Sequence, residues 1–140
     1  MEVSFSIPGE PKGKQRPYSG KDKFGHTIMF TPAQTRNYEN WVKTMYMVEC
    51  RNKKLSGAIE AVITGYFRVP KSESKKRRGL MLQNLIHYTK KIDCDNMAKI
   101  ILDSLNKIAY DDDKQVVRLT VEKLYAEDDR VEVTLREIGE

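Results

Sequence analysis

The pattern of apolar and polar residues predicts a chain of strands interrupted by helices. Alternation of apolar with polar residues, together with β-branched and aromatic residues, predicts strands at residues 2–7, 58–69, 116–125 and 130–138. Only the acidic turn at residues 126–129 separates the last two strands, so we expect them to pair as a C-terminal hairpin. A short strand at residues 26–30 follows the polar turn at residues 19–25, which predicts a second, looser hairpin.

A long helix is predicted from Pro32 to about Asn52. Thr31 is a typical helix cap, and proline is favoured at the first helical position. The residues expected to face the core follow helical spacing: Trp41, Met45 and Val48, joined by Tyr38, Val42 and Cys50. We therefore expect Trp41 to be a core residue rather than a platform for a stacked base.

A second amphipathic helix is predicted over residues 96–109. Its core-facing stripe consists of Met97, Ile101, Leu105 and Ile108. A second, polar stripe consists of Asn96, Lys99, Asp103 and Lys107. Ahead of this helix, Gly65 indicates a bulge or a close approach within its strand. The charged run at residues 71–78 is expected to be a solvated loop, and residues 79–86 a short helical piece.

These elements predict one α/β (α+β) domain over residues 1–140, with a mixed β-sheet packed against helices. Of the 140 residues 39% are hydrophobic and 32% charged, which is typical of a globular domain with a core. Two cysteines and two histidines without metal-binding spacing argue against a disulfide framework and a zinc site. We find no signal peptide and no apolar run long enough to cross a bilayer, so we expect a cytoplasmic protein without membrane contact.

The net charge of +5 is concentrated in basic clusters that flank an acidic segment. The clusters are Lys12, Lys14 and Arg16, then Lys71, Lys75, Lys76, Arg77 and Arg78, then Lys90 and Lys91. Gly13 lets the backbone of the first cluster approach another group closely. A basic surface that only confers solubility is the alternative. We favour nucleic acid as the partner, because the clusters lie on both sides of the acids in sequence.

The acidic segment at residues 91–115 holds six of the 20 acidic residues: Asp93, Asp95, Asp103, Asp111, Asp112 and Asp113. Clustered carboxylates repel one another unless they share a cation, for which Mg²⁺ or Mn²⁺ is the natural candidate. If residues 91–95 are extended, Asp93 and Asp95 point to the same face, next to a helix start that attracts phosphate. The third carboxylate then comes from the turn at residues 111–113, folded back beside this pair.

Two further residues of the second helix bear on this site. Lys99 returns to the side of Asp95 one turn later, where it can steady a carboxylate or a phosphate. Asp103 lies two turns down the helix, so we do not expect it to be a ligand. Each part alone has an ordinary interpretation, as a helix cap, a solvated turn or a helical ion pair. The combination is more specific than any of its parts.

The residues Asp93-Cys94-Asp95-Asn96, Lys99, Asp103 and Asp112-Asp113-Lys114-Gln115 closely resemble the RusA-type Holliday-junction resolvases, over nearly the whole chain. The resemblance implies a small homodimeric endonuclease with a mixed α/β fold, of a kind that prophages often carry. Such enzymes use Mg²⁺, or Mn²⁺ in its place, to make paired nicks in four-way DNA junctions during recombination and repair. The expected setting is the cytoplasm of a bacterial or phage-infected cell.

Residue by residue, the resemblance assigns the catalytic carboxylates to Asp93, Asp95 and Asp113, and the active-site lysine to Lys99. Asp112 joins the three carboxylates as a metal ligand, and the register within residues 111–113 stays open by one position. Asp103 matches a recurrent family position that we interpret as structural, or as one that supports the ligands without binding the metal. The residues expected to bind DNA, mainly through phosphates, are Lys12, Lys14, Arg16, Lys75, Lys76, Arg77, Arg78, Lys90 and Lys91.

Two other functions stay open at this point. One is a metal-dependent nuclease for other branched DNA, such as flaps or forks, which a comparison of substrates would distinguish. The other is a non-catalytic junction-binding module whose acids hold a structural cation. We rank this module lower, because a surface that only binds DNA gains nothing from acids beside its phosphate contacts.

Overall fold

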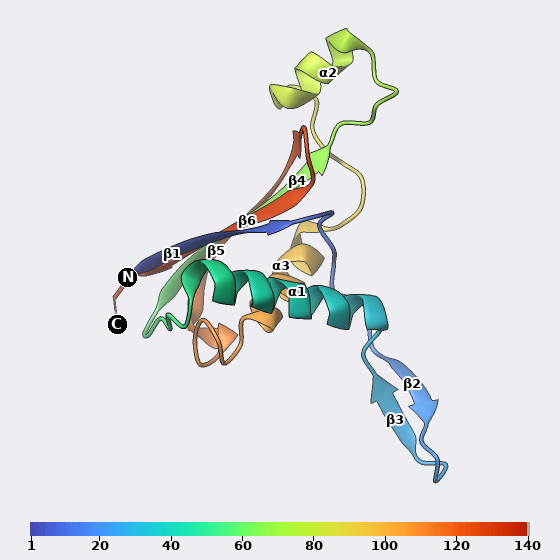
Figure 1. Ribbon diagram of the computed structural model, residues 1–140, viewed down its shortest axis with the longest axis vertical. Helices are drawn as coiled ribbons and strands as arrows, with labels where there is room; N and C mark the ends of the chain where they lie inside the picture. Colours follow the sequence, from blue (N-terminus) through green and yellow to red (C-terminus); the bar gives the residue numbers. More distant parts are fainter. Residues whose placement is uncertain (140) are drawn as a thin grey trace.

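The computed structural model describes residues 1–139, which form one mixed sheet with helices packed on one face (Figure 1). The sheet has the strand order β1-β6-β4-β5. Strands β4 and β5 run parallel, whereas β6 runs antiparallel to both of its neighbours. The strand bounds are β1 (Glu2–Pro8), β4 (Ile59–Arg68), β5 (Val116–Ala126) and β6 (Arg130–Glu137). A mixed sheet packed with helices confirms the expected fold class.

The last two strands do not form the expected C-terminal hairpin, because β4 lies between them. Their connection crosses the end of β4, where the amide of Arg68 donates to the Asp129 carboxylate (2.8 Å). The next amide, of Val69, donates to the carbonyl of Ala126 (3.0 Å). Alternating apolar residues predict which face of a strand is buried, but not which strand it pairs with. The hairpin prediction was therefore wrong although both strands exist.

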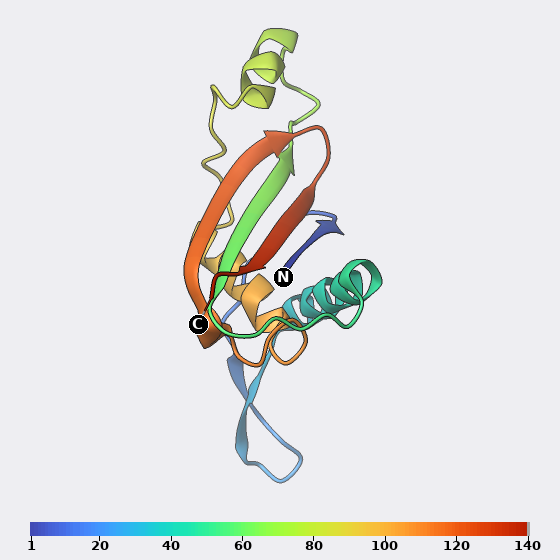
Figure 2. The same cartoon turned by 90° about the vertical axis from the view of Figure 1, so that its left-hand side faces the viewer.

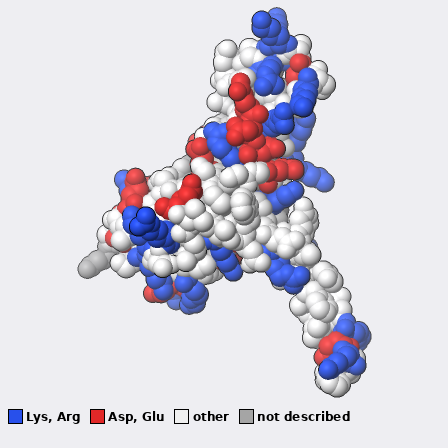
Figure 3. All heavy atoms as spheres, in the orientation of Figure 1, with Lys and Arg blue, Asp and Glu red and all other residues white. Residues whose placement is uncertain are grey.

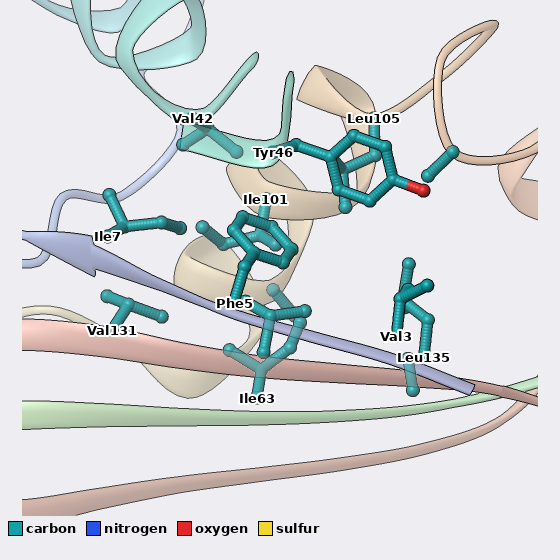
Figure 4. Packing of buried hydrophobic residues seen from close by; sticks show 14 of the residues in the cluster. Val3, Phe5, Ile7, Val42, Tyr46, Ile63, Ile101, Leu105, Val131 and Leu135 are labelled. Carbon is teal, nitrogen blue, oxygen red and sulfur yellow. The ribbon is translucent and has the colours of Figure 1, made fainter. Parts of the chain in front are cut away.

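The core lies between the sheet and two helices, α1 (Ala33–Cys50) and α3 (Cys94–Ser104). Figure 4 shows Val42 and Tyr46 of α1 and Ile101 of α3 facing the sheet. There they belong to the same core cluster as Phe5 of β1 and Ile63 of β4. The predicted stripe of the second helix is confirmed in its first three members, which are fully buried: Met97, Ile101 and Leu105. No helix within residues 1–139 is both long and apolar enough to cross a membrane.

The orientation of α1 differs from the prediction. The helix begins at Ala33 with Pro32 as N-cap, and no side chain caps its first turn. Its buried face consists of Thr35, Tyr38, Val42, Tyr46 and Cys50. Trp41 remains 41% exposed and Val48 68% exposed. Two apolar stripes compete on this helix, and the stripe that contains Tyr38 faces the core, so Trp41 is not the core residue that we expected.

Two projections extend the molecule at opposite ends of the sheet (Figure 2). The predicted loose hairpin is confirmed as β2 (Tyr18–Lys21) and β3 (Thr27–Phe30), which pair antiparallel. At the other end the charged run is not wholly a loop, because α2 (Lys75–Leu82) begins within it. The Ser74 hydroxyl caps this helix by accepting from the amide of Arg77 (3.2 Å), and Met81 is buried against Val69 and Tyr125.

Gly65 in β4 marks the close approach of α3 to the sheet, one of the two features expected of it. A Cβ built at this position would lie 2.6 Å from Sδ of the fully buried Met97. We expect Gly65→Ala to lower the free energy of unfolding by about 1 kcal/mol, because the core must shift to admit the methyl group. Urea denaturation measures this change.

Gly79→Ala is the matched control for this prediction. Gly79 lies inside α2, and a Cβ there would meet nothing within 4 Å. Alanine should therefore raise the free energy of unfolding by roughly 0.5–1 kcal/mol, since it restricts the unfolded chain and favours the helix. Equal effects of the two substitutions would contradict the packing argument.

Candidate active site

The first two aspartates lie at the start of α3. Asp93 is the N-cap residue, with extended backbone angles (φ −68°, ψ 147°), and Asp95 belongs to the first helical turn. The backbone is thus extended only as far as Asp93, so the two carboxylates do not share a face in the way that a strand would place them. The Asp93 carboxylate accepts from the side-chain amide of Asn96 (3.3 Å). Both aspartates are exposed at a helix end that favours negative charge.

The basic loop at residues 12–17 packs directly against this helix. The amide of Lys14 donates to the carbonyl of Asn96 (3.0 Å). A Cβ at Gly13 would lie 3.2 Å from Cβ of Asn96 and 3.4 Å from Cβ of Ile92. The close approach expected of Gly13 is therefore confirmed, and the surface that it approaches is the N-terminal part of α3.

Lys14 extends along α3 and joins two carboxylates. Its ammonium lies 2.9 Å from Oε2 of Glu39 on α1 and 3.3 Å from Oδ2 of Asp103 on α3. Burial alone would lower the pKa of Lys14, but the hydrogen bonds and charges of the two carboxylates outweigh it and raise the pKa. Lys14, expected to contact phosphate, thus already has protein partners in this structure.

Asp103 also forms an ion pair with Lys99. The Lys99 ammonium lies 3.4 Å from the same Oδ2 atom, and the Lys99 side chain is 61% exposed. Lys99 and Asp103 line a hollow of about 340 Å³ together with Asn96, Arg16 and Pro17. The helical ion pair considered for the two residues is present, and it faces a hollow that the basic loop completes.

The DDxQ turn after α3 is held by its own side chains. Asp112 caps the short 3-10 helix at Asp113–Gln115 by accepting from the amide of Lys114 (2.9 Å). The Gln115 side-chain oxygen accepts from the amides of Asp111 (2.9 Å) and Asp112 (3.0 Å). Hydrogen bonding by the Lys114 amide lowers the pKa of Asp112. Asp112 and Gln115 therefore fix the shape of the turn.

The three aspartates of this turn point to different partners. Asp111 lies 2.6 Å from the ammonium of Lys54, which lowers its pKa and holds it away from α3. The amide of Asp113 donates to the side chain of Asn106 (2.8 Å). Burial, followed by the neighbouring carboxylates of Asp112 and Asp103, raises the pKa of Asp113. Asp113 is the member of the run whose carboxylate meets Asp103.

The structure therefore arranges four charged residues along one helix and the turn after it, which we call the α3 polar row: Asp95, Lys99, Asp103 and Asp113. Asp103 lies eight positions after Asp95, which corresponds to about 12 Å of helix axis. Asp113 lies beside Asp103, not folded back beside Asp93 and Asp95 as expected. Within residues 1–139, no three His, Cys, Asp or Glu side chains converge closely enough to enclose one metal ion.

The remaining basic residues do not form one surface with this row. Arg16 lines the same hollow as Lys99, whereas Lys12 lies 3.5 Å from the carboxylate of Glu10. Lys91 and Lys12 line a neighbouring hollow of about 410 Å³ that also includes Asn96. Figure 3 shows a separate basic area at the α2 end of the molecule, away from the helices that carry the row. This α2 cluster consists of Lys75, Lys76, Arg77 and Arg78.

Asp103, which we expected to support the site rather than to bind the metal, lies among the charged residues of α3. It is the meeting point of Lys14, Lys99 and Asp113. Its position four residues after Lys99, on the polar stripe of α3, was the available signal. The sequence could not show that the DDxQ turn would return to this end of the helix.

Comparisons with known proteins give a consistent result. Residues 8–136 match the family model described as endodeoxyribonuclease RusA. The chain is also 34% identical over 139 residues to "Uncharacterized protein YqaN" of Bacillus subtilis (strain 168), covering 98% of this chain and 97% of that protein. The matched region contains the complete polar row and the basic loop.

Proposed function

Because the chain belongs to the RusA family of endodeoxyribonucleases, we propose that it resolves four-way (Holliday) junctions by paired, symmetric nicks. The proposed reaction depends on Mg²⁺, with Mn²⁺ as a substitute. It would act in recombination and repair of DNA in the cytoplasm of a bacterium or a phage-infected cell, including prophage DNA.

The observation that carries this proposal is the α3 polar row with the basic loop beside it. Carboxylates lie at both ends of the row, and the exposed Lys99 lies between them. Arg16 shares the hollow with Lys99, so two cations can face one phosphate group. A surface that alternates phosphate-binding cations with carboxylates suits hydrolysis of a phosphodiester better than binding alone.

The carboxylates of the row fit a hard divalent cation by their chemistry. Burial and then the neighbouring carboxylates raise the pKa of Asp113, and a bound cation would relieve the repulsion among these carboxylates. Magnesium commonly takes one or two protein carboxylates and keeps several waters, so three converging acids are not required. One or two such ions would be held by Asp93 and Asp95 at the start of α3 and by Asp112 and Asp113 in the turn after it. When bound, the ion would supply an activated water and positive charge beside the scissile phosphate.

The chain's own residues have separate tasks in this proposal. Lys99 binds the scissile phosphate or supports the leaving oxygen, and Asp103 orients Lys99 through their ion pair. Asp93 and Asp95 lie at the start of α3, where the unpaired amides of the first helical turn would favour an incoming phosphate. Arg16, Lys12, Lys90, Lys91 and the α2 cluster bind junction arms through phosphates.

A homodimer completes the proposal. A four-way junction presents two strands related by symmetry, and paired nicks need two polar rows. One chain supplies one row, so two copies related by a two-fold axis match the substrate.

The test is a cleavage assay on a labelled mobile four-way junction, a matched linear duplex and a flap, each with Mg²⁺ or with EDTA. We expect paired nicks in the junction, little cleavage of the duplex, and complete loss with EDTA. Equal cleavage of the flap would instead support a general nuclease for branched DNA. Tight junction binding without nicks in both Mg²⁺ and Mn²⁺ would support a non-catalytic binding module.

A further inference from the structure

A third hollow lies beside the basic loop, where β1 ends against α1. It has a volume of about 560 Å³ and opens to solvent. Its lining includes Trp41, Tyr38 and Asn37 of α1, and Lys12 of the basic loop. Lys12, Gln34 and Glu10 also line the hollow that reaches Asn96 at the start of α3. We call the hollow of about 560 Å³ the Trp41 pocket. It adjoins the proposed active site, but none of the acids of that site lines it.

Trp41 has the properties of a fixed aromatic platform. Its indole N–H donates to the carbonyl of Pro8 (2.8 Å), which holds the ring in one orientation. The residue nevertheless stays 41% exposed, although tryptophan is among the side chains that most favour burial. An exposed aromatic ring in a hollow is a surface on which a flat ligand can stack.

Polar groups in the pocket point to a ligand with hydrogen-bonding edges. Tyr38 is 7% exposed, and its fully buried hydroxyl lies beside the backbone of Lys12, so this ring forms part of the wall and its hydroxyl does not reach a ligand. The exposed side-chain amide of Asn37 adds a donor and an acceptor at the rim.

We propose that the Trp41 pocket takes an unpaired nucleobase of the DNA substrate, stacked on Trp41 with its polar edge toward Asn37. Stacking on aromatic rings is the general way in which proteins hold unpaired bases. Lys12 also lines the pocket, where it could contact the backbone phosphate of that nucleotide, and its charge offsets that of Glu10 at 3.5 Å. The inference rests on the proposed function, because base stacking is interrupted at a branch point and the pairs there open more easily than those of a linear duplex.

The pocket would give the protein a structural criterion for its substrate. Phosphate contacts alone hold any DNA, because the backbone charge is the same in duplexes and junctions. A base can enter the pocket only where pairing is already broken or is easily broken. The Trp41 pocket therefore favours branched DNA over duplex without reading a long sequence.

The sequence contains one tryptophan, so its fluorescence reports this pocket directly. The full-length protein is titrated with a four-way junction and with a linear duplex in EDTA, which keeps the DNA uncut, while anisotropy of labelled DNA follows binding. We expect quenching by the junction at saturation and little by the duplex. A junction with abasic sites at the crossover keeps its phosphates and should bind without the quench. Quenching that persists with abasic sites, or is absent at saturation, would overturn the proposal.

Trp41→Ala should weaken junction binding about tenfold and leave duplex binding unchanged. Trp41→Phe should retain most of the affinity because it keeps an aromatic surface. Met47→Ala is the matched control, since Met47 is 43% exposed on the same helix and does not line the pocket. Equal junction affinity of Trp41→Ala and wild type, with both folded by circular dichroism, would refute the pocket while leaving the nuclease intact. No binding to any DNA would instead remove the proposed function, and the pocket with it.

Discussion

Replacing Asp113 with asparagine is expected to reduce junction nicking roughly 1,000-fold, whereas Asp111→Asn should leave the rate within about twofold of wild type. The two residues belong to one run of aspartates, and the sequence leaves their register open. The structure separates them, because Asp111 pairs with Lys54 and is 78% exposed, while Asp113 meets Asp103 at the end of the α3 polar row. Single-turnover cleavage of a labelled junction measures the rates.

Neither unfolding nor a loss of DNA binding should cause this difference between the two variants. Asparagine keeps the size of the side chain, so both variants should retain the fold, which thermal unfolding can check. Junction affinity of Asp113→Asn should stay equal or rise, because one negative charge near the DNA is gone. A loss of nicking in Asp111→Asn, with Asp113→Asn active, would show that the register is shifted by two positions.

Asp95→Asn extends the test to the other end of α3. We expect a loss of nicking similar to that of Asp113→Asn, although about 12 Å of helix axis separates Asp95 from Asp103. Similar losses would mean that one reaction uses carboxylates from both ends of the row. Full activity of Asp95→Asn would remove Asp95 from the proposed metal ligands and leave Asp93, Asp112 and Asp113.

Local patterns in the sequence predicted most elements of the fold. Period-two alternation identified the strands of the sheet, and the stripe from Met97 to Leu105 identified the buried face of α3. The errors arose where partners distant in sequence decide the outcome. Strand β4 inserts between β5 and β6, and α2 forms because Met81 packs on Val69 and Tyr125. Alternation and charge runs contain no information about such partners.

In the candidate site, too, local motifs were predictable whereas contacts between distant residues were not. The DxDN and DDxQ motifs locate the acids in the sequence, but the sequence does not show which acid faces which. The capping of the turn by Asp112 and Gln115 sends Asp111 toward Lys54 and Asp113 toward Asp103. Trp41 illustrates the converse, because its helical spacing suits a core residue while the orientation of α1 leaves it in a pocket.

Lys14→Met is expected to lower the free energy of unfolding by roughly 1–3 kcal/mol, which separates Lys14 from the other cations of the basic loop. Its ammonium lies between Glu39 and Asp103, whose side chains are 17% and 21% exposed. Methionine removes the charge but keeps the length, so both carboxylates would stay partly desolvated without their shared partner. This cost exceeds that of losing an exposed ion pair, which is typically below about 1 kcal/mol. Urea denaturation measures the difference.

Arg16→Gln provides the matched control in the same loop. Arg16 lines the hollow with Lys99 and has no carboxylate partner within 4 Å among residues 1–139, so its replacement should change stability by less than about 0.5 kcal/mol. It should instead weaken DNA binding and reduce the slope of log affinity against log salt by about one. The reverse pattern would make Lys14 a phosphate contact. In that pattern Lys14→Met keeps the free energy of unfolding, but its affinity for DNA depends less on salt. In that case the stability of the fold would not depend on the contacts of Lys14 with Asp103 and Glu39, and Asp103 would act through its ion pair with Lys99.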